Sequence, residues 1–149
     1  MVKNVFLADL VFIFHCIIIL FVLLAPFTQI PAILILHITF GFCLFIHWWA
    51  NSNVCSLTVL EASLRGLDRT DTFTHQFVAP LYEISASDWS NIIHLITYTT
   101  MAISIYYLYN SDKLKNTMKC ISELQFSDDT TLFEKIKQYY ICTLPLFTL

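Results

Sequence analysis

The sequence predicts an all-α membrane protein with three transmembrane helices, interfacial amphipathic helices and a short helical C-terminal tail. Of the 149 residues, 57% are hydrophobic and only 13% are charged, whereas soluble domains carry about 25% charged residues. Mean hydropathy is correspondingly high, at +0.67. The chain also contains three apolar runs, at residues 5–25, 31–50 and 91–109. We therefore expect a transmembrane domain, 1–109, that includes an interfacial insert at 54–84, followed by an extramembrane tail, 110–149.

The first span is a nearly continuous apolar run from Val5 to Ala25, broken only by Asp9 and His15. A secretory signal has an apolar core of only about 7–15 residues and a cleavage site of small residues after it. This run is longer and leads into another span, so we interpret it as a retained anchor. Its length is enough for a helix to cross a hydrocarbon layer about 30 Å thick.

The second span, Pro31–Ala50, follows after a short uncharged link that begins at Pro26, so spans one and two form a hairpin. The third, Ile92–Tyr109, is shorter and more polar but has no formal charge, and we expect it to pack against the other two. Tryptophan favours the membrane interface. One membrane face should therefore hold Trp48, Trp49 and Trp89 along with the insert, and the opposite face Tyr106, Tyr107 and Tyr109.

The positive-inside rule leaves orientation nearly balanced, because similar numbers of Lys and Arg residues flank the spans on each face. The balance favours an interior tail only slightly.

The insert begins with Thr58 and Glu61 at the spacing of a capping box, which predicts a short helix from Val59 to Leu64. Leu57, Leu60 and Leu64 then share one face of an amphipathic helix in the membrane interface. Glu61 and Arg65 are spaced for an i, i+4 ion pair, and Gly66 is a natural helix stop. A second amphipathic helix is predicted on Phe73, Phe77 and Leu81, with Pro80 limiting its regularity.

Two motifs of the insert carry a resemblance to a known family. They are C-x-L-T-x-L-E-x-x-L-R at Cys55–Arg65 and F-x-H-x-x-x-x-P-L-Y at Phe73–Tyr82, and ADLVFIFH in the first span and His37 in the second also fit. The chain resembles, from Ala8 to Ser85, the family of small membrane proteins known as domain of unknown function 2784, with relatives in large DNA viruses. Its structural signature here is Cys55, Thr58, Glu61, Arg65, His75 and Pro80.

This chain departs from the bacterial members of that family at Ser56, where they usually have proline, and in spans that are rich in Ile and Phe rather than Ala and Gly. Such a bias suits an AT-rich genome, such as that of a large virus. The family has no assigned activity, so the resemblance implies a fold and no mechanism.

Three groups of residues invite a chemical interpretation, and each has a structural alternative. Intramembrane histidines ligate haem in some proteins but also form hydrogen bonds between helices; they are His15, His37, His47 and His94. Asp9, Glu61, Arg65 and His75 form either a transport site or a structural latch, and we favour the latch. Cys55 is either a nucleophile that would need a base such as His75, or a small buried thiol, which we favour.

No catalytic, cofactor-binding or metal-binding residue follows from these patterns, and the chain is not expected to be an enzyme. The five cysteines are scattered and no CxxC occurs, so neither a metal site nor a disulfide framework is predicted. A channel is the weakest possibility, because three spans without an internal repeat would have to oligomerise.

The tail has two helical stripes. The first is Leu114, Met118 and Ile121, and the second, introduced by a capping box at Thr131–Glu134, is built on Leu132, Phe133, Ile136 and Tyr140. The final segment, ICTLPLFTL, is expected to be strand-like or irregular and to need a covering partner.

The sequence therefore predicts a structural integral membrane protein, a minor capsid or inner-membrane component of a large DNA virus that links the virion's internal membrane to its protein shell. Its partners would be the lipid bilayer and neighbouring capsid or membrane proteins contacted through 110–149, with no nucleic acid. The alternative is a membrane protein that binds haem or another small molecule through its intramembrane histidines.

Overall fold

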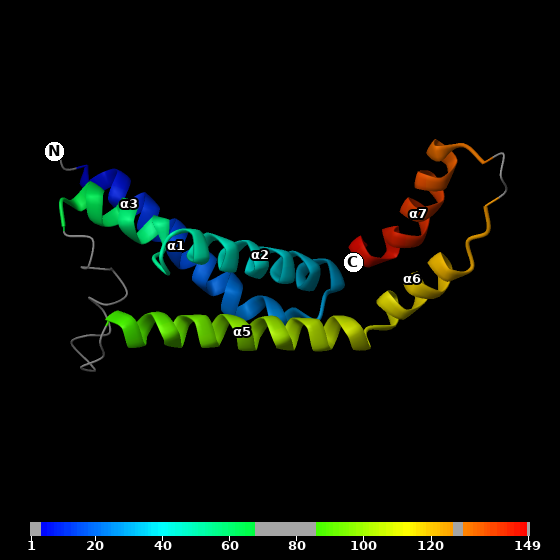
Figure 1. The fold of residues 1–149 in the computed structure, drawn as a ribbon, viewed down its shortest axis with the longest axis horizontal. Helices are drawn as coiled ribbons and strands as arrows, with labels where there is room; N and C mark the ends of the chain where they lie inside the picture. Colours follow the sequence, from blue (N-terminus) through cyan, green and yellow to red (C-terminus); the bar gives the residue numbers. More distant parts are fainter. Residues whose placement is uncertain (1–3, 68–85, 127–129, 149) are drawn as a thin grey trace.

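The computed structural model describes residues 4–67, 86–126 and 130–148, and these residues form helices joined by short links. Three long helices form the body of the molecule (Figure 1): α1 (Val5–Leu24), α2 (Pro31–Ala50) and α5 (Ala86–Asn110). A 3₁₀ turn, η1 (Ala25–Thr28), joins the first two. All three helices are long and apolar enough to cross a membrane, which confirms the predicted fold class and its three candidate spans.

The contact between α2 and α5 combines small and polar side chains with Met101 and with the stacked rings of Phe45 and Tyr98. On α5 the buried residues are Thr97, Thr100, Met101 and Ser104, which repeat at i, i+3, i+4 and i+7. A Cβ on Gly41 of α2 would lie only 2.6 Å from Met101 Sδ, so glycine allows the two helices to approach closely. Large apolar side chains of the same helices are exposed, as expected for surfaces that face lipid rather than water.

The three long helices are arranged as predicted, with the end of the second next to the start of the third. The C-terminal end of α2 and the N-terminal end of α5 lie at the same end of the bundle (Figure 1). There the Trp48 and His94 rings meet edge to face, 4.4 Å apart, while Trp49 is 85% exposed. The Trp89 side chain lies outside the described part of the structure. At the far end of α5, Tyr106 and Tyr109 are exposed.

Helix α3 (Ser56–Arg65) runs antiparallel to the first half of α1 (Figure 1). Near its C-terminal end the Asn4 N–H donates to the Leu64 carbonyl at 3.1 Å. Gly66 ends the helix in a left-handed conformation with φ of 70°, as predicted. Its placement in the membrane interface stays a prediction, and the second amphipathic helix, with His75 and Pro80, lies outside the described residues.

Two predictions about α3 are wrong. The helix begins at Ser56 rather than Val59, and within the described residues no side chain caps its first turn, so Thr58 and Glu61 do not form a capping box. Its buried face is Thr58, Glu61 and Ala62, whereas Leu60 is 47% exposed. Part of the reason is the ion pair between Arg65 of α3 and Asp9 of α1, which turns the charged side of α3 toward α1.

The tail forms a helical hairpin of α6 (Asp112–Ser122) and α7 (Leu132–Phe147), with the predicted capping box at Thr131 and Glu134. A disulfide joins Cys120 to Cys142, so the expectation of no disulfide framework is wrong. The last segment is also helical as far as Phe147, not strand-like or irregular, even though Pro145 lies inside it. Burial of Cys142 and Leu146, one helical turn apart, explains why the helix continues.

Candidate functional site

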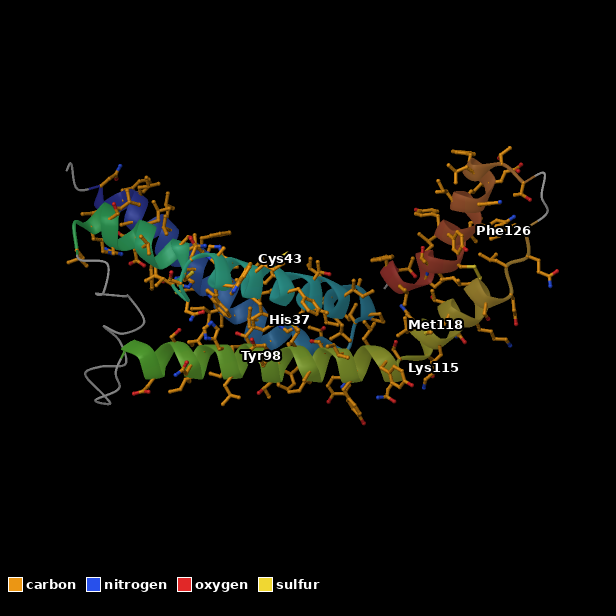
Figure 2. All side chains as sticks on the ribbon, viewed as in Figure 1. His37, Cys43, Tyr98, Lys115, Met118 and Phe126 are labelled. Carbon is orange, nitrogen blue, oxygen red and sulfur yellow. A yellow bond between two sulfur atoms is a disulfide. The ribbon has the colours of Figure 1, made fainter. Side chains whose placement is uncertain are left out.

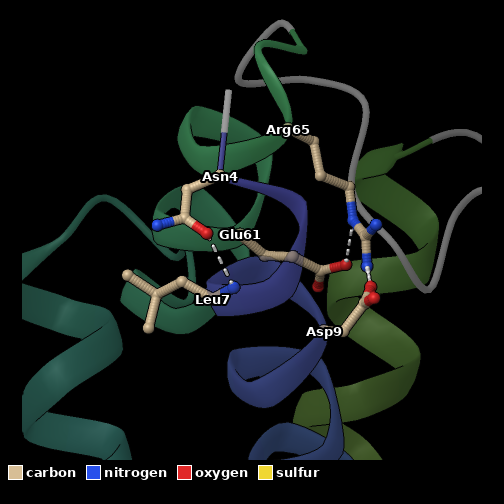
Figure 3. Close-up of polar contacts among 5 residues, drawn as sticks. All are labelled: Asn4, Leu7, Asp9, Glu61 and Arg65. Carbon is tan, nitrogen blue, oxygen red and sulfur yellow. Dashed lines mark hydrogen bonds and ion pairs between the residues drawn. The ribbon is translucent and has the colours of Figure 1, made fainter. Parts of the chain in front are cut away.

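The charged cluster between α1 and α3 contains three of the four residues predicted to converge (Figure 3). The Arg65 guanidinium donates through Nε to Glu61 Oε1 at 2.9 Å and through an Nη atom to Asp9 Oδ1 at 2.8 Å. The i, i+4 ion pair is therefore confirmed, and Asp9 extends it to the neighbouring helix. The fourth predicted member, His75, lies outside the described residues.

Burial differs sharply across this cluster. Glu61 is only 2% exposed, and its second carboxylate oxygen is buried without a partner among the described residues. The Asp9 side chain, in contrast, is 54% exposed. Hydrogen bonding to Glu61 raises the pKa of Arg65, burial opposes this, and Asp9 adds to the increase. The cluster therefore ties α3 to α1 through a permanently charged guanidinium, which is the geometry expected of a latch.

The opposite end of α3 meets two histidines from two different spans. The Ser56 N–H donates to His47 Nε2 at 3.1 Å, and Cys55 Sγ lies 3.9 Å from His15 Nε2. Burial raises the pKa of the Cys55 thiol. The contact with His15 and the backbone N–H groups of Leu57 and Thr58 outweigh burial, so that pKa lies below its ordinary value. Among the described residues, the histidine that contacts Cys55 is His15, while the predicted His75 lies outside them.

His37 occupies the centre of the bundle and is only 1% exposed. Its Nε2 lies 3.1 Å from the Val22 carbonyl, and its Nδ1 lies 2.9 Å from Ser104 Oγ. A carbonyl only accepts, so Nε2 carries the proton and donates to Val22, and Nδ1 accepts from the Ser104 hydroxyl. Figure 2 shows the position of His37 between the three long helices.

The Val22 carbonyl needs this partner because of the local sequence. In an α-helix it would accept from the residue four positions later, which is Pro26, and proline has no N–H. The Ala25 N–H is already used by the Phe21 carbonyl. His37 therefore caps the C-terminal end of α1 at a depth where little water is present to do so. This explains a histidine in an otherwise apolar span.

The same geometry bears on the haem alternative. Both ring nitrogens of His37 are engaged, and His47 accepts from the Ser56 N–H through Nε2 while its Nδ1 lies 3.4 Å from the Asn51 amide nitrogen. Neither ring has a free lone pair to offer an iron. Among the described residues, no group of three or more His, Cys, Asp and Glu is arranged to hold a metal ion.

An open cleft of about 290 Å³ lies where the α2–α3 link meets α3. Its walls are Asn51, Val54, Ser56, Val59, Leu60 and Ser63. None of these side chains is ionisable, so the cleft offers shape but no acid, base or charged anchor.

The tail hairpin exposes a continuous apolar stripe on α7, made of Leu132, Phe133, Ile136, Tyr140 and Phe147, each between 57% and 76% exposed. Cys142 and Leu146 face inward, and the disulfide holds that inner side against α6. Phe126, just after α6, meets the Tyr139 ring at 5.6 Å and the Lys135 ammonium at 5.6 Å (Figure 2). The disulfide therefore holds the stripe in place, and the described residues leave it exposed.

These features define an all-α protein with three candidate membrane spans, a helix α3 that an ion-pair cluster joins to α1, and a disulfide-linked hairpin of α6 and α7. No family model, characterised protein or solved structure matches the chain. The resemblance carried by the Cys55–Arg65 motif remains a prediction. Four of its signature residues lie on or at the start of α3, which are Cys55, Thr58, Glu61 and Arg65.

Sequence reasoning missed the pairing of Cys120 with Cys142 and the role of Ser104. The disulfide could have been suspected from one cysteine on each of two consecutive amphipathic segments. The role of Ser104 could not, because its partner lies 67 positions away in sequence and a polar residue in an apolar helix does not indicate which residue it contacts.

Proposed function

We propose that this chain is a structural membrane protein whose tail links the membrane to a protein shell. In its most specific form it is a minor capsid or inner-membrane component of a large DNA virus. The observation that carries the proposal is the uncovered apolar stripe of α7, held on a hairpin that a disulfide makes rigid. An exposed apolar surface of this kind usually marks an interaction site.

The body of the molecule supports a structural role. Arg65 joins α3 to α1, His37 joins all three long helices, and Gly41 lets α2 and α5 pack closely. Each of these contacts holds helices in fixed positions. The resemblance to a family with viral relatives and the Ile- and Phe-rich spans support the viral form of the proposal.

The disulfide also bears on orientation. Disulfides persist in oxidising surroundings, which include virion surfaces and secretory compartments, and are rare in the reducing cytoplasm. Cys120–Cys142 therefore favours a tail on the oxidising side of the membrane, against the slight preference of the charge count for an interior tail. The shell partners are proposed on that same side.

The test places a charge in the stripe of the full-length protein. Ile136→Glu should leave membrane insertion intact and reduce incorporation into the native particle at least tenfold, because the contact surface then carries a carboxylate. Gln138→Glu is the matched control. It adds the same charge on the opposite side of α7, by the 3.6-residue repeat, and Gln138 is also exposed.

Incorporation is measured as the ratio of particle-associated to membrane-associated protein. Equal incorporation of both variants and the unmodified chain would refute the proposal. A photo-crosslinking residue at Phe133 adds a second readout. Adducts with shell proteins are expected, while adducts with lipid alone would show that the stripe lies on the bilayer and overturn it.

A further inference from the structure

The described cysteines fall into three different settings. Cys120 and Cys142 form the tail disulfide, and Cys16 and Cys43 lie within the spans α1 and α2. Cys55 is a free, half-buried thiol at the junction between the end of α2 and the start of α3. It is the only one of the three free thiols that lies outside the candidate spans in the described residues.

We propose that Cys55 and His15 form a reactive thiol site that accepts a fatty acyl group from a long-chain acyl-CoA thioester. The pair is assembled from two elements, with His15 Nε2 from α1 at 3.9 Å from Cys55 Sγ. The inference is independent of the proposed function of the tail.

Three features of this junction favour the thiolate over the thiol. His15 is placed to take up the proton, and its imidazolium would lie beside the sulfur. The first backbone N–H groups of α3 lie at the positive end of that helix, where an anion is stabilised. The lowered pKa of Cys55 agrees with this geometry. The charged cluster of Asp9, Glu61 and Arg65 lies further along α3, and His47, from α2, meets the adjacent Ser56.

The surroundings favour an acyl donor over a soluble electrophile. Ile46 and Trp49, near the end of α2, are 65% and 85% exposed, and Leu60 on α3 is 47% exposed. These exposed apolar side chains lie on α2 and α3, the two helices that the junction joins, in a protein whose long helices have the length and composition of membrane spans. A hydrocarbon chain attached at Cys55 would enter lipid beside them, as at other juxtamembrane cysteines that carry acyl groups.

The reaction balances without a redox step. The Cys55 thiolate attacks the thioester carbonyl carbon and forms a new carbon–sulfur bond, while the bond to the coenzyme A sulfur breaks. His15 holds the proton removed from Cys55 and returns it to the departing coenzyme A thiolate. The product is an acyl-cysteine thioester on the protein and free coenzyme A.

The experiment uses the purified full-length protein in phosphatidylcholine vesicles with palmitoyl-CoA at neutral pH. Intact mass and hydroxylamine-sensitive labelling should show one palmitoyl group, mapped to Cys55 by peptide analysis. Cys55→Ser should abolish it, whereas Cys16→Ser and Cys43→Ser, the matched controls inside the spans, should retain it. Palmitoylation at Cys16 or Cys43, or at no residue, would overturn the proposal.

His15→Gln tests the role of the base. At neutral pH the acylation rate should fall at least tenfold. The rate of Cys55 alkylation by iodoacetamide, measured in the Cys16→Ser, Cys43→Ser background, should reach its midpoint at a higher pH than with His15 present. Because alkylation reports the thiol directly, an unchanged midpoint together with an unchanged acylation rate would remove His15 from the site and refute the pair.

Discussion

Replacing His37 with leucine tests the idea that this histidine caps the end of α1. Leucine is apolar and of similar size, so the substitution removes two hydrogen bonds with little change in packing. The Ser104 hydroxyl can then bond a carbonyl of its own helix, but the Val22 carbonyl faces Pro26, which has no N–H. A buried unpaired polar group costs about 1–3 kcal/mol, and we expect a loss of stability in that range.

A double-mutant cycle separates the two bonds of His37. Ser104→Ala leaves only Nδ1 unpaired, and hydrogen bonds between membrane helices average about 0.6 kcal/mol, with a maximum near 1.7 kcal/mol. We therefore expect Ser104→Ala to cost about 1 kcal/mol and to add nothing once His37 is replaced by leucine. The free energy of unfolding is measured by titrating the protein in mixed micelles with SDS and following helix content.

Pro26→Ala provides the decisive comparison, because it restores an N–H four residues after Val22. In that background His37→Leu should cost less than about 1 kcal/mol, since the carbonyl can be satisfied within its own helix. If His37→Leu costs as much in the Pro26→Ala background as with the native proline, the capping explanation is wrong and His37 stabilises the bundle in some other way.

Three further predictions concern the latch, the hairpin and its cap. Arg65→Leu should destabilise the protein in micelles by about 1–3 kcal/mol, because it leaves the buried Glu61 carboxylate without its ion-pair partner. Asp9→Asn should cost under about 1 kcal/mol, because Asp9 is exposed. Equal losses of stability in the two variants would contradict this difference. Cys120→Ser should destabilise the α6–α7 hairpin by about 3 kcal/mol, given the sequence separation of 22 between the cysteines. Amide hydrogen exchange should then become faster in α7 but not in α5, and unchanged protection of α7 would refute the prediction. Thr131→Ala should cost about 1 kcal/mol by removing a capping box, again visible as faster exchange in the first turn of α7, and an unchanged rate there would count against the cap.

The sequence by itself determined the three spans, because their length and apolar character follow directly from what a bilayer requires of a helix. It also determined features set within one turn of helix, such as the Glu61–Arg65 pair, the stop at Gly66 and the cap at Thr131. Local spacing decides such contacts, so no knowledge of the fold is needed.

Only the tertiary structure decided what lies across from each residue. Thr58 and Glu61 have the spacing of a capping box but do not form one, because Glu61 pairs with Arg65 and Thr58 is buried. The buried face of α3 depends on the same pairing, because Glu61 and Arg65 meet Asp9 of α1 while Leu60 stays exposed.

The contacts that join distant parts of the chain were likewise set by the fold. His15 meets Cys55 across 40 positions and Ser104 meets His37 across 67, and neither pairing has a periodicity that a sequence pattern would reveal. The disulfide between Cys120 and Cys142 depends on how the α6–α7 hairpin closes. The sequence thus determined the three candidate spans and the local caps and ion pairs, whereas the packing of the helices determined which distant polar groups meet and kept the last segment helical to Phe147.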